Sequence, residues 1–362
     1  MAWPASAAGA AYTPPGNGVY AGLTGGTSIE RYERMVGKHP AVFETYMTWN
    51  TPTAWLSNRA SGFLARLALH LSTAAGYGQP GVISPLGIAR GGSDRFLVAL
   101  NRNLARSGRI VYVRIMAEMN GYWNPYAPFA ASGAFRGAQN SPSAYVAAWR
   151  RTVVILRGGR VGAIDRRLRA LGLPPLRTQL RRRAELAHPR IAFLWVPQDA
   201  GSPDIAANAP GAFWPGAQYV DWVGTDFYAS YPNFDLLSRY YAAYSSKPFV
   251  LSEWALYGAD DPGFVRALFA WIASHPRVRM VNYYQGFSRS GLPDLGHYPR
   301  SRVALRRALS SPRFVAYAPE YRLKHVRGRR HRRERPPLPP QPGAPPNPLR
   351  VCLPLLKLCL TL

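Results

Sequence analysis

Short apolar segments alternate with longer amphipathic segments from Gly18 to about Tyr321. Several of the short segments, such as IVYVRIM and IAFLWV, are mostly apolar without alternation, which is typical of strands buried on both faces of a parallel sheet. Between them, apolar residues spaced three and four apart predict helices. The predicted strands are 18–21, 41–49, 82–86, 110–116, 191–196, 220–227, 249–252 and 278–284, and the predicted helices include 93–106, 141–156, 235–244 and 262–274.

This alternation predicts an α/β fold. Eight strands with intervening helices favour a single closed (β/α)8 TIM barrel over an open doubly wound sheet, and such barrels commonly reach about 250 residues or more as one domain. The chain is 47% hydrophobic and 12% aromatic, which is enough apolar material for a large core. It contains no G-x-G-x-x-G opening a helix, no P-loop and no G-x-S-x-G, so nucleotide-binding and α/β-hydrolase signatures are absent.

The positive charge is concentrated in two segments. The formal net charge is +27, and residues 151–190 and 322–362 each contribute +9, so the remaining 281 residues carry only +9. Arginine supplies 41 of the 45 basic residues, a bias more typical of high-GC coding than of a selected surface. We therefore expect no specific nucleic-acid binding, although an anionic-polymer binder stays open as a third function class.

The segments outside the regular pattern set the domain boundaries. Residues 1–17 are predicted to be a flexible leader without an intact secretory signal, and 18–321 the barrel domain. The Arg-rich stretch 157–190 precedes a strand, so we expect a solvated insertion on the face opposite the catalytic loops, with a patch for an anionic cell-surface polymer as the alternative. Residues 322–362 are basic and then proline-rich, which predicts a disordered tail, and no apolar run in the chain is long enough for a transmembrane segment.

Metal and cofactor chemistry finds little support in the sequence. The seven histidines are dispersed and none pairs with another ligand type at helical spacing, while both cysteines, Cys352 and Cys359, lie in the tail. We therefore predict no metal site, no cofactor and no disulfide framework in the core.

Two glutamates stand out as candidate catalytic residues. Glu118 follows the strand 110–116 and Glu253 follows the strand 249–252, and side chains at the carboxyl ends of barrel strands point into the active-site mouth. Two carboxylates facing one site suit glycoside hydrolysis, in which one donates a proton to the leaving oxygen and the other stabilises or attacks the oxocarbenium-like centre. A separation of about 5 to 5.5 Å predicts retention of configuration, and about 6.5 to 9.5 Å predicts inversion.

Aromatic and polar residues accompany the two glutamates. Sugar rings stack on aromatic side chains, and Asn120 can either bind a sugar hydroxyl or shape its turn. Arg114 lies inside a buried strand and needs a partner. We expect an ion pair or hydrogen bond in the barrel interior near the floor of the site, with direct support of a catalytic carboxylate as the alternative. The candidate substrate-binding residues are Asn120, Trp123, Trp195, Asp226, Tyr228, Trp254 and Tyr284.

These segments resemble glycoside hydrolase family 26, which is rich in β-mannanases and belongs to a clan of retaining (β/α)8 enzymes. The resemblance rests on RIMAEMNGYWNP, FLWVPQDAGSP, FWPGAQYVDWVGTDFY and KPFVLSEW, with GVYAG and GKHPAVFETYMTW at the start, and it covers roughly 18–311. It implies Glu118 as acid/base and Glu253 as nucleophile. It also implies Trp123 beside the substrate, and Asp226 with Tyr228 as a pair whose tyrosine holds the nucleophile.

The sequence departs from the family pattern at substrate-contacting positions. The family usually has histidine before the acid/base, where this chain has Ala117, and the expected strand-8 tryptophan is replaced within VNYYQG. The predicted third strand, VISPLGIAR, offers no match for a substrate-binding histidine. The resemblance implies a monomeric, secreted or cell-surface retaining glycosidase acting on β-linked polysaccharide, mannan first, with a cytoplasmic location open. The alternative is a degenerate barrel that binds polysaccharide without turnover.

Overall fold

The computed structural model describes residues 11–25, 28–56, 64–76, 78–286, 292–322, 350–353 and 358–361. Its parallel strands close into a barrel. β10 pairs with β1, Tyr20 lying opposite Met280, and this pairing completes the ring. The predicted (β/α)8 barrel is therefore confirmed. The barrel strands are β1 (Val19–Thr24), β2 (Val42–Thr48), β3 (Arg66–Ser72), β4 (Val111–Ile115), β7 (Ile191–Trp195), β8 (Trp222–Tyr228), β9 (Phe249–Ala255) and β10 (Val278–Tyr284).

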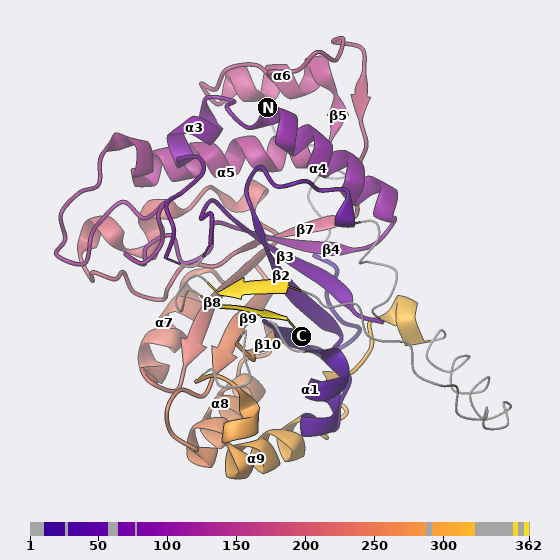
Figure 1. The fold of residues 1–362 in the computed structure, drawn as a ribbon, viewed down its shortest axis with the longest axis vertical. Helices are drawn as coiled ribbons and strands as arrows, with labels where there is room; N and C mark the ends of the chain where they lie inside the picture. The colour runs from indigo at the N-terminus through magenta and orange to yellow at the C-terminus, as the bar shows by residue number, and fades with distance from the viewer. Residues whose placement is uncertain are drawn as a thin grey trace, which may run out of the picture.

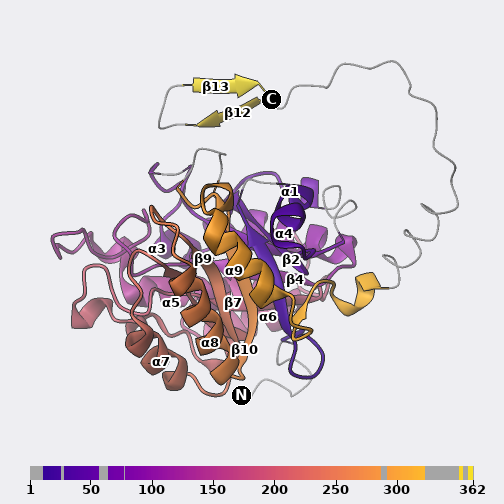
Figure 2. The same ribbon diagram turned by 90° about the horizontal axis from the view of Figure 1, so that it is seen from below.

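Helices surround the barrel on its outside (Figures 1 and 2). Serine caps and first-turn prolines start several of them, as at Ser141, whose hydroxyl accepts the Ala144 N–H, and Gly108 ends α4 in the left-handed conformation. The four helices predicted above are present within a residue or so. The helices are α1 (Ile29–Val36), α3 (Pro85–Ala89), α4 (Asp94–Ser107), α5 (Pro142–Leu156), α6 (Val161–Ala170), α7 (Phe234–Ala243), α8 (Pro262–Ser274) and α9 (Pro299–Leu309).

The third predicted strand was wrong. Residues 82–86 lead into helix α3, and the third barrel strand is β3, which pairs with β2 and β4. Its sequence RLALHLS carries Arg66 and His70 at positions that face the barrel interior, so the apolar run is interrupted. The sequence of β3 therefore has the pattern of a weak, half-polar strand, although the side chains of Arg66 and His70 are both buried.

The inward-facing residues change character along the barrel axis. Near the amino ends of the strands they are apolar and aromatic and form a core cluster of their own, which includes Tyr20, Val42, Tyr112 and Trp222. Two residues further along β2 and β4, and four further along β8, the same rows carry Glu44, Arg114 and Asp226, because alternate strand residues face the same side. The carboxyl end of the barrel thus holds a buried charged layer above a mostly apolar floor, which also contains Arg66 in an ion pair with Glu320.

The Arg-rich insertion contains structure of its own. Strands β5 (Gly159–Arg160) and β6 (Glu185–Leu186) pair antiparallel, and α6 buries Ile164 and Leu168 in the main core. Its arginines 160, 166, 169 and 181–183 are exposed. The insertion is therefore anchored by its apolar side and presents its charge to solvent.

Most of the predicted leader and disordered tail lies outside the described residues. Within the tail, β12 (Arg350–Leu353) and β13 (Leu358–Thr361) pair antiparallel. In the part of the chain that is described, no helix is both long and apolar enough to cross a membrane.

Candidate active site

Arg114 is the centre of the charged layer. This fully buried side chain from β4 donates through Nη1 to Glu44 Oε1 at 2.8 Å and to Glu253 Oε1, and through Nη2 to Asp226 Oδ2. Three carboxyls from β2, β8 and β9 therefore share one guanidinium. Because an unpaired buried charge is costly, this network holds the acidic groups at the carboxyl end of the barrel in one arrangement.

Glu253 receives donors from three directions. Tyr46 Oη donates to Oε1 at 2.8 Å and Tyr228 Oη to Oε2 at 2.6 Å, while Arg114 contacts Oε1. Burial, together with the negative charge of Glu253, raises the pKa of both phenols well above its usual range, so the phenols stay protonated. These donors stabilise negative charge on the Glu253 carboxylate and fix its orientation.

A β-bulge in β9 aims Glu253 into the barrel. The register against β8 shifts between Thr225, opposite Leu251, and Asp226, opposite Glu253, so one residue of β9 is extra. As a result the consecutive residues Ser252 and Glu253 both face inward, and the Ser252 hydroxyl donates to Glu44 Oε2 at 3.1 Å. Bulges of this kind commonly re-aim a side chain next to an active site.

Glu118 stands on a strained turn at the end of β4. Its φ of 51° is left-handed, a conformation unfavourable for a residue with a side chain. The backbone N–H of Glu118 donates to the Val196 carbonyl at 2.7 Å, and the side-chain Nδ2 of Asn124 donates to the Glu118 carbonyl at 2.9 Å. These bonds hold the turn in the conformation that presents the carboxyl group.

The environment of Glu118 favours the protonated acid. Burial raises the pKa of its carboxyl group, and the negative charge of Glu253 acts in the same direction. Trp123 Nε1 donates to Oε2 at 2.8 Å and Gln198 Nε2 donates to Oε1, which opposes part of the shift. Burial also raises the pKa of Asp226, which interacts directly with Glu118, so a proton on either carboxyl group can bridge the two.

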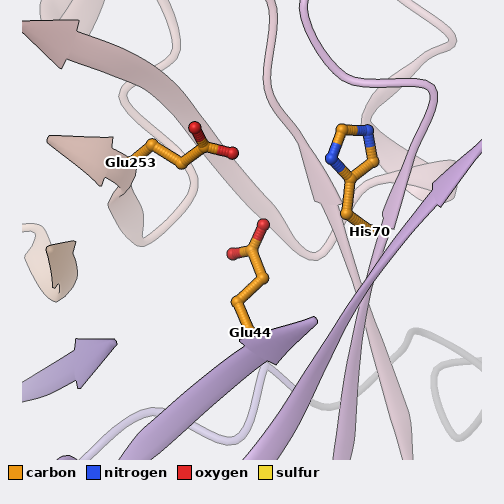
Figure 3. Close-up of side chains that lie close together, drawn as sticks. All are labelled: Glu44, His70 and Glu253. Atoms are coloured by element: carbon orange, nitrogen blue, oxygen red, sulfur yellow. The ribbon is translucent and has the colours of Figure 1, made fainter. Parts of the chain in front are cut away.

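His70 is buried beside the same layer (Figure 3). Neither ring nitrogen has a hydrogen-bond partner among the described residues, and burial, aided by Arg114, lowers the histidine pKa well below its usual range. Ligand atoms of His70, Glu44 and Glu253 lie within 4.8 Å of one another. However, Arg114 already bonds to both glutamates, so a cation is in place and we assign no metal to this trio.

Three of the residues predicted to bind substrate have other roles in the structure. Trp195 and Trp254 are buried and lie on the outward face of their strands, where they pack against Tyr244 and Phe269 respectively. The alternation of strand residues causes this placement, because the inward neighbours Leu194 and Glu253 occupy the interior. Neither tryptophan has a free face for a sugar, so both predictions are corrected.

Asn120 holds two loops together. Its amide donates to the carbonyls of Gln198 and Ala200, and its Oδ1 accepts the Gln198 N–H at 2.8 Å. The buried side chain is fully engaged with backbone, which decides between the two interpretations left open above in favour of the turn.

The remaining predicted residues gather at the carboxyl end of the barrel. Trp123 is 44% exposed and contacts Glu118, while Tyr228 contacts Glu253 and packs edge-on against Tyr284. The sequence prediction missed Glu44, Tyr46, His70 and Gln198. The inward alternation of β2 and β3 is the signal that could have found the first three, whereas Gln198 lies in a loop and has no pattern of its own.

Known proteins of solved structure share the fold of this chain. The sequence matches no protein-family model and no curated protein. Among solved structures, the Bacillus subtilis mannanase man26 is 17% identical with a TM-score of 0.52, over 84% of this chain and 88% of that one. The chain has the fold of a family 26 mannanase. A modular endo-β-1,4-mannanase from Cellulomonas fimi, described as a family 26 enzyme, is 14% identical with a TM-score of 0.53 over 83% and 72%, and GH26A from Muricauda is 14% identical with a TM-score of 0.52 over 83% and 92%.

The charged layer can be tested by removing its cation. Arg114→Met leaves three buried carboxyl groups without their partner, so we expect a loss of about 3 to 5 kcal/mol in the free energy of unfolding at neutral pH, measured by urea denaturation. Burial raises the pKa values of Glu44 and Asp226, and Arg114 counteracts part of that shift. Without the arginine both pKa values rise further above those of the unfolded chain, so the loss should grow as pH rises and shrink as pH falls. Exposed Arg166→Met is the control, and equal stability of the two variants at pH 8 would contradict this account.

Proposed function

We propose that the protein is a retaining glycoside hydrolase that cleaves β-linked polysaccharide of the mannan type. The observation that carries the proposal is the pairing at one end of the barrel of a carboxyl group with a raised pKa, Glu118, and a carboxylate held by Arg114, Tyr46 and Tyr228. A carboxyl group whose protonated form is favoured, together with a second one whose oxygens accept hydrogen bonds from an arginine and two tyrosines, suits the roles of acid and nucleophile. The mannanase fold supports the choice of substrate.

In the proposed mechanism Glu118 protonates the leaving glycosidic oxygen while Glu253 attacks the anomeric carbon. The resulting glycosyl-enzyme ester is hydrolysed by a water that loses its proton to Glu118, so the configuration at the anomeric carbon is retained. Arg114 and the two phenols position Glu253, Asp226 exchanges a proton with Glu118, and exposed Trp123 offers its ring to a sugar. The neutral imidazole of His70 is buried beside Glu44 and Glu253 and has no hydrogen-bond partner among the described residues.

Ala117 does not argue for a degenerate barrel. The family resemblance implies a histidine at that position, but here Trp123 and Gln198 bond to the adjacent Glu118 carboxyl group. His70 on β3 offers an imidazole where the resemblance implies a strand-3 histidine. No observation favours binding without turnover over hydrolysis.

Release of reducing sugars from mannan, glucomannan and xylan tests the proposed function, with product configuration followed by NMR. We expect mannan-type polymers to be cleaved and the first product to be the β-anomer. An inert wild-type protein that still binds the polymers would overturn the hydrolase proposal, and an initial α-anomer would overturn retention.

Trp123 should influence the pH at which activity is lost on the alkaline side. The acid form of Glu118 is required, so activity falls as pH rises through the raised pKa of this carboxyl group. The Trp123 N–H bond favours the charged form, and Trp123→Phe should therefore raise that pKa further and move the alkaline limb of the kcat profile to higher pH. An alkaline limb that stays in place or moves down would contradict the assignment, whereas a change in KM alone would report only sugar stacking.

We further propose that the protein acts as a monomer outside the cell or at its surface, which suits a polymeric substrate. Among the described residues, the exposed arginines 160, 166, 169 and 181–183 of the insertion form no ion pair with an acidic side chain, whereas the largely buried Arg157 pairs with Asp221. They can attract an anionic cell-surface polymer in a salt-dependent way. Association that does not weaken with added salt would argue against this role.

A further inference from the structure

A second concave site lies outside the barrel, between α1 and α9. Figure 1 shows these two helices side by side, and a groove of about 560 Å³ opens between them. Its lining residues come from α1, from the turn before α9 and from α9 itself, and four of the six are arginines. We call this site the arginine groove, lined by Arg31, Arg34, Met35, Gly296, Arg302 and Arg306.

The charge in this groove is poorly compensated. Helix α9 has four arginines and no acidic residue, and Arg302 and Arg306 are four residues apart on one face, where like charges repel. Within the described ranges, no ion pair involves Arg34, Arg302 or Arg306. An anion in the groove would remove this repulsion.

Asp294, the acid that pairs with Arg31, is already occupied. Asp294 accepts from Arg31 Nη2 at 2.9 and 3.0 Å, from the Gly296 N–H at 2.7 Å and from Gln285. This buried carboxylate orients Arg31 and has little capacity left for the arginines of α9. The groove therefore keeps an excess of positive charge together with at least one guanidinium in a fixed orientation.

The end of α1 helps to place Arg306. Gly37 caps α1 with a left-handed φ of 71°, and a Cβ added there would lie 2.9 Å from Arg306 Nε. The guanidinium thus lies over the carbonyl end of α1, where the helix dipole favours a cation. Glycine leaves the space that this placement needs.

We propose that the arginine groove binds a phosphoryl group, either as a free ion or on a phosphorylated saccharide. Guanidinium forks match phosphate oxygens in paired hydrogen bonds, and a phosphoryl dianion offsets more of this charge than one carboxylate does. The groove shares no lining residue with the charged layer around Arg114, so this site is independent of the proposed hydrolase function.

Titration of the full chain with inorganic phosphate, a hexose 6-phosphate and glucuronate at about 150 mM salt tests the proposal by calorimetry. The variant is Arg302→Gln/Arg306→Gln, and the matched control is Arg166→Gln/Arg169→Gln, which removes the same charge from exposed positions of α6. We expect the groove variant to weaken phosphate binding about tenfold or more and the control less than about twofold. Arg34→Gln, at an exposed position, should weaken it in the same direction without risk to folding.

Comparing inorganic phosphate with the hexose 6-phosphate distinguishes a free phosphate ion from a phosphorylated saccharide as the occupant of the arginine groove. Tighter binding of the hexose 6-phosphate than of phosphate supports a phosphorylated saccharide, and equal binding supports the free ion. Equal losses in both double variants would mean diffuse attraction to a basic protein and would overturn the proposal. Undetectable phosphate binding, or glucuronate binding as tightly as the hexose 6-phosphate, would overturn it too. Mannan hydrolysis by the groove variant should be unchanged, which separates this test from that of the proposed function.

Discussion

Glu253→Gln should lower kcat/KM on mannan by about 10⁴-fold or more, the scale on which enzymes lose activity with their covalent nucleophile. The amide keeps the size of the side chain but cannot form a stable ester with the anomeric carbon. It also removes the negative charge that Arg114 and Tyr228 now stabilise. Steady-state kinetics on a soluble mannan measures the loss.

Two further measurements distinguish a nucleophile from a positioning residue. Glu33→Gln on α1 changes a half-exposed glutamate far from the charged layer and should leave kinetics unchanged. Glu253→Ala with azide and an activated β-mannoside should form the α-mannosyl azide, because azide enters the space that the carboxylate vacates. Activity of Glu253→Gln within about tenfold of wild type, or a β-azide from Glu253→Ala, would remove Glu253 from the nucleophile role.

Glu118→Ala should have the second largest effect, and its size should depend on the leaving group. On mannan we expect a loss of about 10²- to 10⁴-fold, because the departing oxygen needs a proton. On a dinitrophenyl β-mannoside the first step needs no acid, so a burst of dinitrophenol should be followed by slow turnover. Azide should then restore turnover and yield the β-mannosyl azide by attack on the glycosyl-enzyme.

The control for this variant is Glu185→Ala, which changes an exposed glutamate of the insertion. It should behave as wild type on both substrates. If Glu118→Ala lost activity equally on mannan and on the dinitrophenyl glycoside, without a burst, the residue would be required for structure or binding and the acid/base assignment would fail.

The two glutamates were predictable because each lies near the carboxyl end of a mostly apolar strand, Glu118 just beyond β4 and Glu253 within β9. The carboxyl ends of parallel strands converge at one end of a barrel. Local sequence was therefore sufficient to bring two residues 135 positions apart into one site.

The partners of the glutamates were not predictable in the same way. Glu44 and His70 lie within strands whose polar residues resemble the solvent face of an amphipathic strand, and the error in the third strand hid His70 altogether. The predictions that Trp195 and Trp254 bind substrate failed for the opposite reason, since an aromatic residue near a strand end can face either the substrate or the surrounding helices. A shift of one residue in the alternation exchanges these two outcomes.

The sequence by itself determined the alternation of strands and helices apart from the third strand, the barrel class and the two carboxyl groups at strand ends, because these depend on local periodicity and on the polarity of strand ends. Only the tertiary structure decided that Arg114 joins Glu44, Asp226 and Glu253, and that Arg302 and Arg306 meet Arg31 across a groove. Such contacts depend on barrel closure, on the bulge in β9 and on helix packing, which bring together side chains that have no fixed spacing along the chain.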